Sequence, residues 1–437
     1  MLAAMRGHYL KKIVIDENNK NLYFSSISCI FAKKIYMIER EIYLRKLRQL
    51  KDQDLIKVIT GVRRCGKSTL LEAFHSELVL SGVKDENIIF FNFEERENIK
   101  FSDWTVLYDE IISKVSSNQK NYVLLDEVQL ITDFEKLVNG LFVKKNIDLY
   151  ITGSNAYLLS SELATLLTGR YIAINLHPFS FAEYTLAFPE EKNTDRLFRQ
   201  FLNNSSFPEA VNLSKTAPEL VNDYLQSIYN TVIVKDIIQR HKLRNLNNLQ
   251  RIIEFLFNSV GSLVSPTNIA EQLNKNSDKT ISHNTVIKLL GYLTESYILY
   301  AAPRYDIKGK ELLSTHEKYY MIDLGLRNIT QTNKYDTDLG HKLENIIYLE
   351  LLRRGGKVFI GKNKDKEVDF IVQKANNERE YYQVAYTVND EKNFEREVSS
   401  FRNIRDNYPK YLLTLDYDNV IIEGIQKKNV IDWLLEK

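Results

Sequence analysis

The segment 61–68 constrains the fold of this chain more than any other part of its sequence. It reads Gly-Val-Arg-Arg-Cys-Gly-Lys-Ser and matches the pattern Gly-x-x-x-x-Gly-Lys-Ser/Thr at every fixed position. A strand-like run, 55–60, precedes it, and a helical pattern, 68–80, follows it. Glycines here let backbone N–H groups turn towards phosphate oxygens, and the start of the helix adds positive potential. The sequence therefore predicts a phosphate-binding loop rather than a chance glycine turn beside a lysine.

The polar residues of this loop have predicted roles in binding a nucleoside triphosphate and Mg²⁺. We expect Lys67 to reach the β and γ phosphates and Ser68 to give a hydroxyl ligand to Mg²⁺. The other loop positions predicted to contact the nucleotide are Gly61, Arg64, Cys65, Gly66 and Thr69. Arg63 and Arg64 could instead contact a partner or nearby acids, and the sequence does not choose between these roles.

A second apolar strand, 122–126, ends in the acids Asp126 and Glu127. Ligands of parallel sheets collect at the carboxyl ends of the strands. We expect Asp126 to hold Mg²⁺, directly or through water, and Glu127 to orient and polarise the attacking water. An acid pair alone would also suit a solvated strand end. Its combination with Lys67 makes the prediction specific, and the second acid favours hydrolysis of the nucleotide.

Two further candidates follow a third strand, 149–152. Gly-Ser-Asn comes directly after it, so Asn155 or Ser154 could touch the γ-phosphate or the attacking water. Arg170 lies further along, in Leu-Thr-Gly-Arg. It could be an arginine finger that acts on the nucleotide of a neighbouring subunit, or a surface arginine.

Short apolar runs alternate with helical stretches from 37 to 182, which predicts an α/β domain with a parallel sheet covered by helices on both faces. With 437 residues the chain is too long for one ordinary core. We assign 37–182 to this P-loop domain. The residues before it, 1–36, show no clear period. They are either an extension foreign to the native protein, with Met37 opening the first amphipathic helix, or a genuine N-terminal arm.

Three more regions follow the P-loop domain. Residues 183–248 are mostly helical, which suits a linker or lid. In 249–328 three helices and a β-ribbon make a winged-helix candidate, with Ser265 and Ser282 as helix N-caps. Residues 329–437 return to an α/β pattern of a helix, 343–354, and strands at 358–361, 367–373 and 381–386.

Several motifs accompany the phosphate loop. They lie at 61–69, 125–129, 152–155, 167–170, 177–181, 183–184, 234–237 with Arg240, 323–328 and 367–371. Together they resemble the prokaryotic AAA-type ATPases that carry a C-terminal domain of unknown function. The resemblance covers residues 37–387. It implies the fold and ATP binding more than a physiological role.

In that family the end of the chain is similar to restriction-endonuclease-like domains, which use a helical Glu, a strand Asp and a Glu-x-Lys on the next strand. Here Glu344 would open the helix, and Asp369 lies on a strand. The third element reads Gln383-Val-Ala, so one acid and the lysine are lost. Those groups would hold a divalent metal and position water. The resemblance therefore implies a nuclease-like fold with a degenerate site and little or no nuclease activity, unless lysines of the run 362–366 substitute.

Bulk composition narrows the partners only slightly. A net charge of +2 gives no general sign of nucleic-acid or membrane binding. No apolar run is long enough to span a bilayer, and two cysteines suggest a reducing cytoplasm. We therefore expect a cytoplasmic ATP-hydrolysing switch or motor that could form a homo-oligomer. The alternatives are a DNA-binding regulator controlled by nucleotide, and a protein-interaction module that uses ATP for assembly without nucleic acid.

Overall fold

The computed structural model describes residues 38–154, 169–243, 246–275, 280–330, 338–402 and 404–436. The predicted extension 1–36 and the predicted helix start at Met37 lie outside these residues. The first described helix, α3 (Glu41–Leu50), buries Tyr43, Leu44 and Leu47. No helix within the described ranges is both long enough and apolar enough to cross a membrane.

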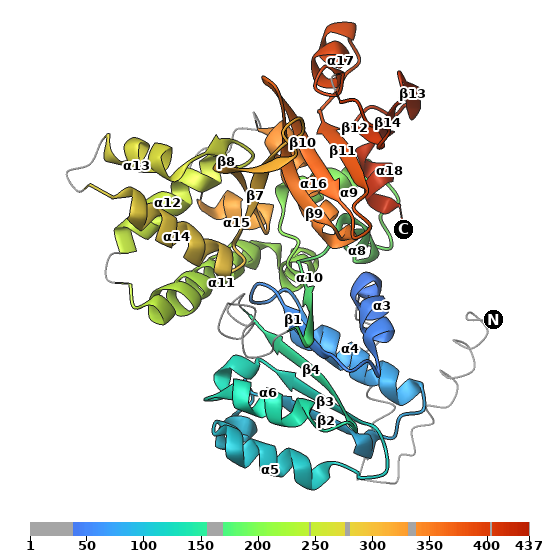
Figure 1. Cartoon of the computed structure of the whole chain (residues 1–437), viewed down its shortest axis with the longest axis vertical. Helices are drawn as coiled ribbons and strands as arrows, with labels where there is room; N and C mark the ends of the chain where they lie inside the picture. Colours follow the sequence, from blue (N-terminus) through green and yellow to red (C-terminus); the bar gives the residue numbers. More distant parts are fainter. Residues whose placement is uncertain are drawn as a thin grey trace. The chain divides into compact units, whose positions relative to one another are not determined.

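The P-loop region contains a sheet of five strands in the order β2-β3-β4-β1-β5 (Figure 1). Every neighbouring pair is parallel. The strands are β1 (Ile56–Thr60), β2 (Ile88–Asn92), β3 (Asn121–Asp126), β4 (Ile147–Gly153) and β5 (Tyr171–Asn175). The predicted parallel sheet is confirmed. Because all five strands run the same way, the end of β1, Asp126 and Gly153 meet at one edge.

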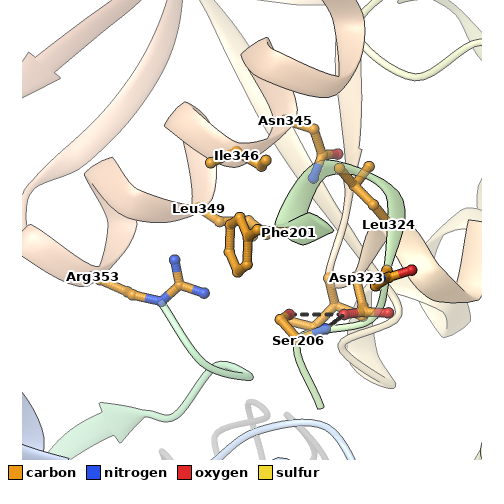
Figure 2. A pocket seen from close by; sticks show the side chains of 10 residues that line it. Phe201, Ser206, Asp323, Leu324, Asn345, Ile346, Leu349 and Arg353 are labelled. Carbon is orange, nitrogen blue, oxygen red and sulfur yellow. Dashed lines mark hydrogen bonds between the residues drawn. The ribbon is translucent and has the colours of Figure 1, made fainter. Parts of the chain in front are cut away.

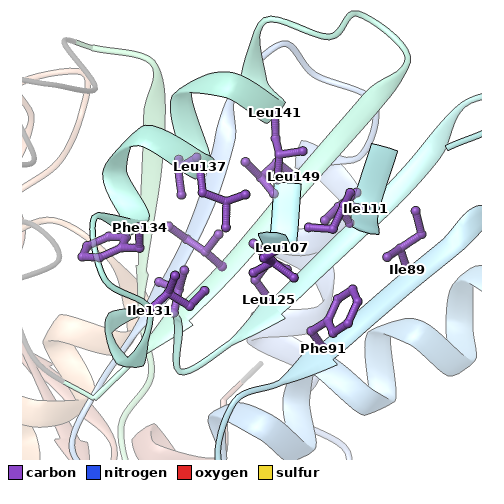
Figure 3. Close-up of a cluster of buried hydrophobic side chains, with 14 of the residues drawn as sticks. Ile89, Phe91, Leu107, Ile111, Leu125, Ile131, Phe134, Leu137, Leu141 and Leu149 are labelled. Carbon is purple, nitrogen blue, oxygen red and sulfur yellow. The ribbon is translucent and has the colours of Figure 1, made fainter. Parts of the chain in front are cut away.

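Helices cover both faces of this sheet, as predicted, because alternate strand residues point to opposite sides. The helices are α4 (Lys67–Leu80), α5 (Trp104–Lys114) and α6 (Phe134–Phe142). Figure 3 shows Leu107 and Ile111 of α5 and Leu137 of α6 against Leu125 and Leu149 of the strands. The intervening strand residues face α4, where the rings of Phe74 and Tyr150 lie 4.9 Å apart. Full burial of a leucine, isoleucine or phenylalanine side chain stabilises the fold by about 1.5–3 kcal/mol.

The region predicted as mostly helical, 183–248, is helical in its described elements. These are α8 (Phe181–Leu186), α9 (Thr194–Asn203), α10 (Pro208–Thr216), η6 (Pro218–Leu220), α11 (Val221–Thr231) and η7 (Val232–Gln239). The last of these, η7, is a π-helix that continues directly from α11. Such segments are rare and often occur at functional sites.

The three helices and the ribbon predicted for 249–328 are also present. The elements are α12 (Leu246–Asn258), β6 (Leu263–Val264), α13 (Pro266–Asn274), α14 (His283–Glu295), β7 (Leu299–Asp306), β8 (Glu311–Met321) and α15 (Leu324–Thr330). Ser265 and Ser282 cap α13 and α14 as predicted, because their hydroxyls accept hydrogen bonds from Asn268 N and Thr285 N. Strand β8 lies between β6 and β7 in the sheet.

The C-terminal region continues this same sheet. Its elements are α16 (Leu339–Arg354), β9 (Lys357–Asn363), β10 (Lys366–Gln373), β11 (Arg379–Val384), α17 (Glu391–Val398), β12 (Lys410–Thr414), β13 (Val420–Ile422), β14 (Ile425–Asn429) and α18 (Val430–Leu435). Strand β9 pairs in parallel with β7, so one sheet of nine strands crosses the predicted domain boundary at 328. The prediction that Glu344 opens its helix is wrong, because α16 begins at Leu339.

The Asp-Leu-Gly-Leu motif that begins at Asp323 joins the helical region to the C-terminal elements. Asp323 Oδ2 accepts hydrogen bonds from the backbone N and the hydroxyl of Ser206, at 2.7 and 2.8 Å. Gly325 packs so closely that an added Cβ would lie 2.5 Å from Ser205 Cβ. Figure 2 shows the Ser206–Asp323 pair beside a small hollow that Arg353 also lines. Asp323 and Gly325 therefore hold the start of α15 against the segment between α9 and α10, which gives this motif a structural role.

Candidate nucleotide site

The loop after β1 has the backbone that its glycines predict. Gly66 has a φ of 101°, in the left-handed region, and is the N-cap of α4. At Gly61, where φ is 150°, an added Cβ would lie 2.2 Å from the Leu176 carbonyl oxygen and 3.0 Å from Cys65 Sγ. Glycine is therefore required at Gly61 by space and at Gly66 by backbone conformation.

Lys67 is buried at the start of α4 and is surrounded by oxygen atoms. Its Nζ lies 3.3 Å from the Gly61 carbonyl, 3.4 Å from the Val62 carbonyl and 3.2 Å from Glu127 Oε1. Burial lowers the pKa of Lys67, but the Glu127 carboxylate outweighs this and holds the pKa above its usual value. The ammonium is therefore charged, and its contacts are long enough for phosphate oxygens to replace them.

Asp126 ends β3 with one carboxylate oxygen satisfied and one without a partner. Thr152 donates its hydroxyl to Oδ1 at 2.5 Å, whereas the buried Oδ2 has no hydrogen-bond partner among the described residues. Burial raises the pKa of Asp126, against the opposing effect of the Ser68 and Thr152 hydroxyls. A buried, unsatisfied carboxylate oxygen close to a hydroxyl fits Mg²⁺, which binds one or two carboxylates together with substrate phosphates.

Glu127 is held by its neighbours on three sides. Its backbone N donates to Thr152 Oγ1 at 2.9 Å, and its carboxylate pairs with Lys67 and accepts a hydrogen bond from Gln129. Burial raises the pKa of Glu127, but Lys67 and Gln129 lower it below its usual value overall. A φ of 56° places Glu127 in the left-handed region, which costs about 1–3 kcal/mol for such a residue. The carboxylate is thus ionised and fixed at the same edge as Lys67.

Of the roles left open for Arg63, the structure gives contact with nearby acids. Its Nε lies 3.2 Å from Asp236 Oδ2 on η7, and its NH1 lies 3.2 Å from Glu94 Oε1. Burial raises the pKa of Asp236, and the Arg63 charge opposes that rise. Arg64 and Thr69 are exposed on the loop and the first turn of α4. The phosphate loop is therefore linked to the π-helix.

Arg40 supports the loop from the other side, and no sequence pattern pointed to it. Its guanidinium donates to the Cys65 carbonyl at 3.2 Å, to the His177 carbonyl at 2.6 Å and to Glu183 Oε1 at 2.7 Å. Glu183 also completes a capping box with Ser180 at the start of α8. The motif residues at 177–184 thus help to anchor the loop through Arg40. Thr152 was also missed, although a polar residue ending an apolar strand could have suggested it.

The remaining predicted residues of this site fall in different places. Asn155 lies outside the described residues. Ser154 is buried, and its hydroxyl oxygen lies 3.5 Å from Gln129 Nε2. Arg170 precedes β5, and its carbonyl accepts a hydrogen bond from Ile56 N at the start of β1. It is therefore at the opposite sheet edge from the loop of its own chain. Its guanidinium lies 5.7 Å from the centre of the Phe142 ring.

The three residues predicted to form a degenerate nuclease-like site lie close together. Glu344 of α16, Asp369 of β10 and Gln383 of β11 are all buried. The side-chain oxygen of Gln383 lies 3.4 Å from Asp369 N. Lys318 of β8, which the sequence did not suggest, pairs with Glu344. The described residues contain no group of three or more His, Cys, Asp or Glu side chains arranged to hold a metal ion.

Two relatives match nearly the whole chain. An uncharacterised protein of Haemophilus influenzae is 40% identical over 405 residues, which is 92% of this chain and 99% of that protein. An uncharacterised protein of Methanocaldococcus jannaschii is 30% identical over 427 residues, 92% of this chain and 89% of that protein. The chain belongs to the family of these two proteins. Their descriptions assign no activity to the family.

Models of protein families match two segments. Residues 53–185 match an AAA domain, and residues 195–336 match a domain of unknown function, DUF8612. The first segment is therefore an AAA-type P-loop ATPase domain, and its bounds agree with the parallel sheet and the loop geometry. The second match ends before α16, so the nuclease-like assignment stays a prediction. A Walker-type ATPase of Pyrococcus abyssi is 16% identical, with a TM-score of 0.48, and covers 67% of this chain and 96% of its own.

Proposed function

We propose that this protein hydrolyses ATP with Mg²⁺ and uses the reaction to change the conformation of its helical region. The observation that carries this proposal is the single edge where Lys67, Ser68, Asp126 and Glu127 meet, with one Asp126 oxygen left unsatisfied by the residues that the structure describes. An ion pair with a purely structural role would not require a glycine loop that directs the N-terminus of α4 towards the same point.

The chain's own residues would act as follows. Phosphate oxygens replace the Gly61 and Val62 carbonyls around Lys67, which then leaves Glu127. The released Glu127 carboxylate, still held by Gln129, accepts a proton from the attacking water. Mg²⁺ held by Ser68 and Asp126 would neutralise charge on the phosphate oxygens.

The link from Arg63 to Asp236 offers a route from this chemistry to the helical region. Arg63 belongs to the phosphate loop, and Asp236 belongs to η7, which continues α11. A phosphate beside the loop competes with Asp236 for the guanidinium. Binding of nucleotide would therefore weaken this contact between the ATPase domain and the helices, and release of nucleotide would strengthen it.

Replacing Glu127 by Gln tests the proposal, because the side chain keeps its shape and loses its basicity. We expect ATP turnover to fall by about 10²–10⁴-fold, while labelled ATP still binds. Glu86→Gln, an identical change at an exposed residue, is the control and should leave turnover unchanged. Unchanged turnover in Glu127→Gln, or no ATP binding by the unaltered protein, would end the proposal.

The predicted role of Arg170 in a neighbouring subunit has its own test. Arg170 is exposed and lies away from the loop of its own chain, so it could act only in an oligomer. Arg170→Ala and Lys67→Ala should each be inactive alone. Mixed together they should regain turnover, because each supplies what the other lacks. Mixtures that stay inactive, together with light scattering that shows a monomer with ATP, would leave Arg170 as a surface residue.

A second candidate function is DNA binding regulated by nucleotide. The helix–strand–helix–helix–ribbon order of α12 to β8, with β8 between β6 and β7, supports a winged helix. His283, Asn284 and Lys288 are exposed on α14, the candidate recognition helix. Filter binding should weaken steeply with salt, and Lys288→Glu should reduce affinity more than Lys84→Glu does. A flat salt response or no binding removes this function.

A further inference from the structure

The acidic groups at the predicted nuclease-like site lie around a lysine supplied by another region. Lys318 comes from the middle of β8, in the ribbon after α14. Glu344 comes from α16, and Glu367 and Asp369 lie two apart on β10. Lys318, Glu344 and Asp369 are each less than a tenth exposed. We call these four residues the Lys318 cluster.

The ammonium of Lys318 bridges two of the acids. Its Nζ lies 2.8 Å from Glu344 Oε1 and 2.7 Å from Glu367 Oε1. Tyr320, two residues along β8, donates its hydroxyl to the same Glu344 oxygen at 2.5 Å. The ribbon thus gives both a charge and a hydrogen bond to α16.

The other predicted ligands also have protein partners. Asp369 Oδ2 accepts a hydrogen bond from Val384 N at 2.8 Å. The Gln383 amide donates to Glu397 at 3.1 Å, and its oxygen accepts from the Ser400 hydroxyl at 3.2 Å. Asp369 Oδ2 and the Gln383 oxygen are therefore already engaged by protein donors, and a metal ion would have to compete with them.

We propose that the Lys318 ammonium is the permanent cation of this cluster and takes the place of the divalent metal that a nuclease-like site would hold. Mg²⁺ and Mn²⁺ need oxygen ligands arranged as a near-octahedron. Here Gln383 stands where the pattern has an acid, and the ammonium lies between the Glu344 and Glu367 carboxylates. Lys362, Lys364 and Lys366, the lysines that the sequence suggested as substitutes, belong instead to β9, β10 and their connecting turn.

This assignment gives the C-terminal region a non-cleaving role and is independent of the proposed ATPase activity. Lys318 and Tyr320 attach the ribbon to α16 and β10, and β7 pairs with β9 in the same sheet. The region that a nuclease would use for cutting is used here to join the ribbon to the C-terminal elements.

Binding of Mn²⁺ to full-length, nucleotide-free protein, followed by electron paramagnetic resonance, tests the assignment. All samples carry Asp126→Asn so that the phosphate loop contributes no metal site. With Lys318 intact we expect no Mn²⁺ binding that depends on Asp369. Lys318→Met should gain a Mn²⁺ site, and adding Asp369→Asn should remove it. Lys357→Met, at an exposed position of β9, should gain none.

Two results would overturn the proposal. One is Mn²⁺ binding, or metal-dependent DNA cleavage, by protein that retains Lys318 and loses the property in Asp369→Asn. The other is a folded Lys318→Met protein that gains no Mn²⁺ site. If Lys318→Met does not fold, the sample with Lys318 intact still decides, because Asp369-dependent Mn²⁺ binding contradicts a permanent ammonium and its absence supports one.

Discussion

Two buried lysines of this protein, Lys67 and Lys318, face glutamates in settings that differ in one respect. Lys67 Nζ lies 3.2 to 3.4 Å from its oxygen neighbours, and nearby Asp126 keeps one oxygen without a hydrogen-bond partner in the described part of the chain. Lys318 Nζ lies 2.7 and 2.8 Å from two glutamates, and nearby Asp369 is hydrogen-bonded to the next strand. We call the Lys67 site incomplete, because the described residues leave one carboxylate oxygen there available to a ligand. We call the Lys318 site complete, because Lys318 and Asp369 are already paired with protein groups.

The difference follows from the elements that carry each lysine. Lys67 starts a helix after a glycine loop, where backbone N–H groups are left over for a ligand. Lys318 lies inside β8, paired on one side with β7 and on the other with β6, so its position is fixed by the sheet. A lysine beside acids therefore indicates a ligand site only where its surroundings leave polar groups unsatisfied.

The largest expected effect is on stability, in Lys318→Met. This change leaves buried acids without their cation, which costs roughly 3–5 kcal/mol. Lys67→Met should cost less, about 1–2 kcal/mol, because Gln129 and Arg63 remain near Glu127. Urea unfolding followed by circular dichroism measures both.

Lys357→Met is the control for these two variants, since it removes an exposed lysine from β9. Its unfolding midpoint should match that of the unaltered protein. Equal losses for Lys67→Met and Lys318→Met would contradict the distinction between an incomplete and a complete site.

The next effect is on turnover, in Lys67→Ala. Loss of the cation that meets the β and γ phosphates should lower ATP turnover by about 10²–10³-fold. Lys84→Ala, at an exposed lysine, should not change it. Steady-state phosphate release gives the comparison. The proposed role of Lys67 is wrong if both variants turn over ATP at the same rate.

The sequence predicted the first lysine and not the second for a physical reason. The phosphate loop is a local structure. Its sequence pattern therefore lies within one short stretch, which contains a strand, two glycines, Lys67 and the start of a helix. Lys318 reaches Glu344 and Glu367 only through the pairing of distant strands, which residue spacing does not reveal. Loss of the nuclease-type lysine at Ala385 was visible, but the sequence pointed to neighbours at 362–366 as substitutes. The hydrogen bonds of Thr152 and Arg40 are non-local in the same way.

A smaller effect concerns pH and the raised pKa of Asp369. Burial and the Glu344 charge raise this pKa well above its usual value. A raised carboxyl pKa adds stability that is complete below the unfolded pKa, about 3.9, and is lost as pH rises through the folded pKa. Asp369→Asn stays neutral, so its stability relative to the unaltered protein should rise with pH above about 4, by about 1.4 kcal/mol for each pH unit until the folded pKa is reached.

Asp126→Asn is the matched variant in the other site, because burial raises the Asp126 pKa as well. The same sign and a smaller rise are expected, since the pKa of Asp369 is raised further than that of Asp126. Midpoints of urea unfolding for both variants and the unaltered protein, at a series of pH values from 4 to neutral, would measure this difference. A relative stability of Asp369→Asn that falls with rising pH would mean that Asp369 is ionised in the folded protein.

The smallest effect tests the contact that joins the incomplete site to the helical region. Asp236→Asn weakens the hold on Arg63, so phosphate meets less competition, and ATP should bind about fivefold more tightly, for about 1 kcal/mol. Glu94→Gln removes the exposed partner of the same arginine and should change affinity less. Fluorescent nucleotide titration separates the two. Because a structural role for Asp236 would weaken binding or leave it unchanged, only tighter binding that disappears in an Arg63→Ala background fits competition for the guanidinium.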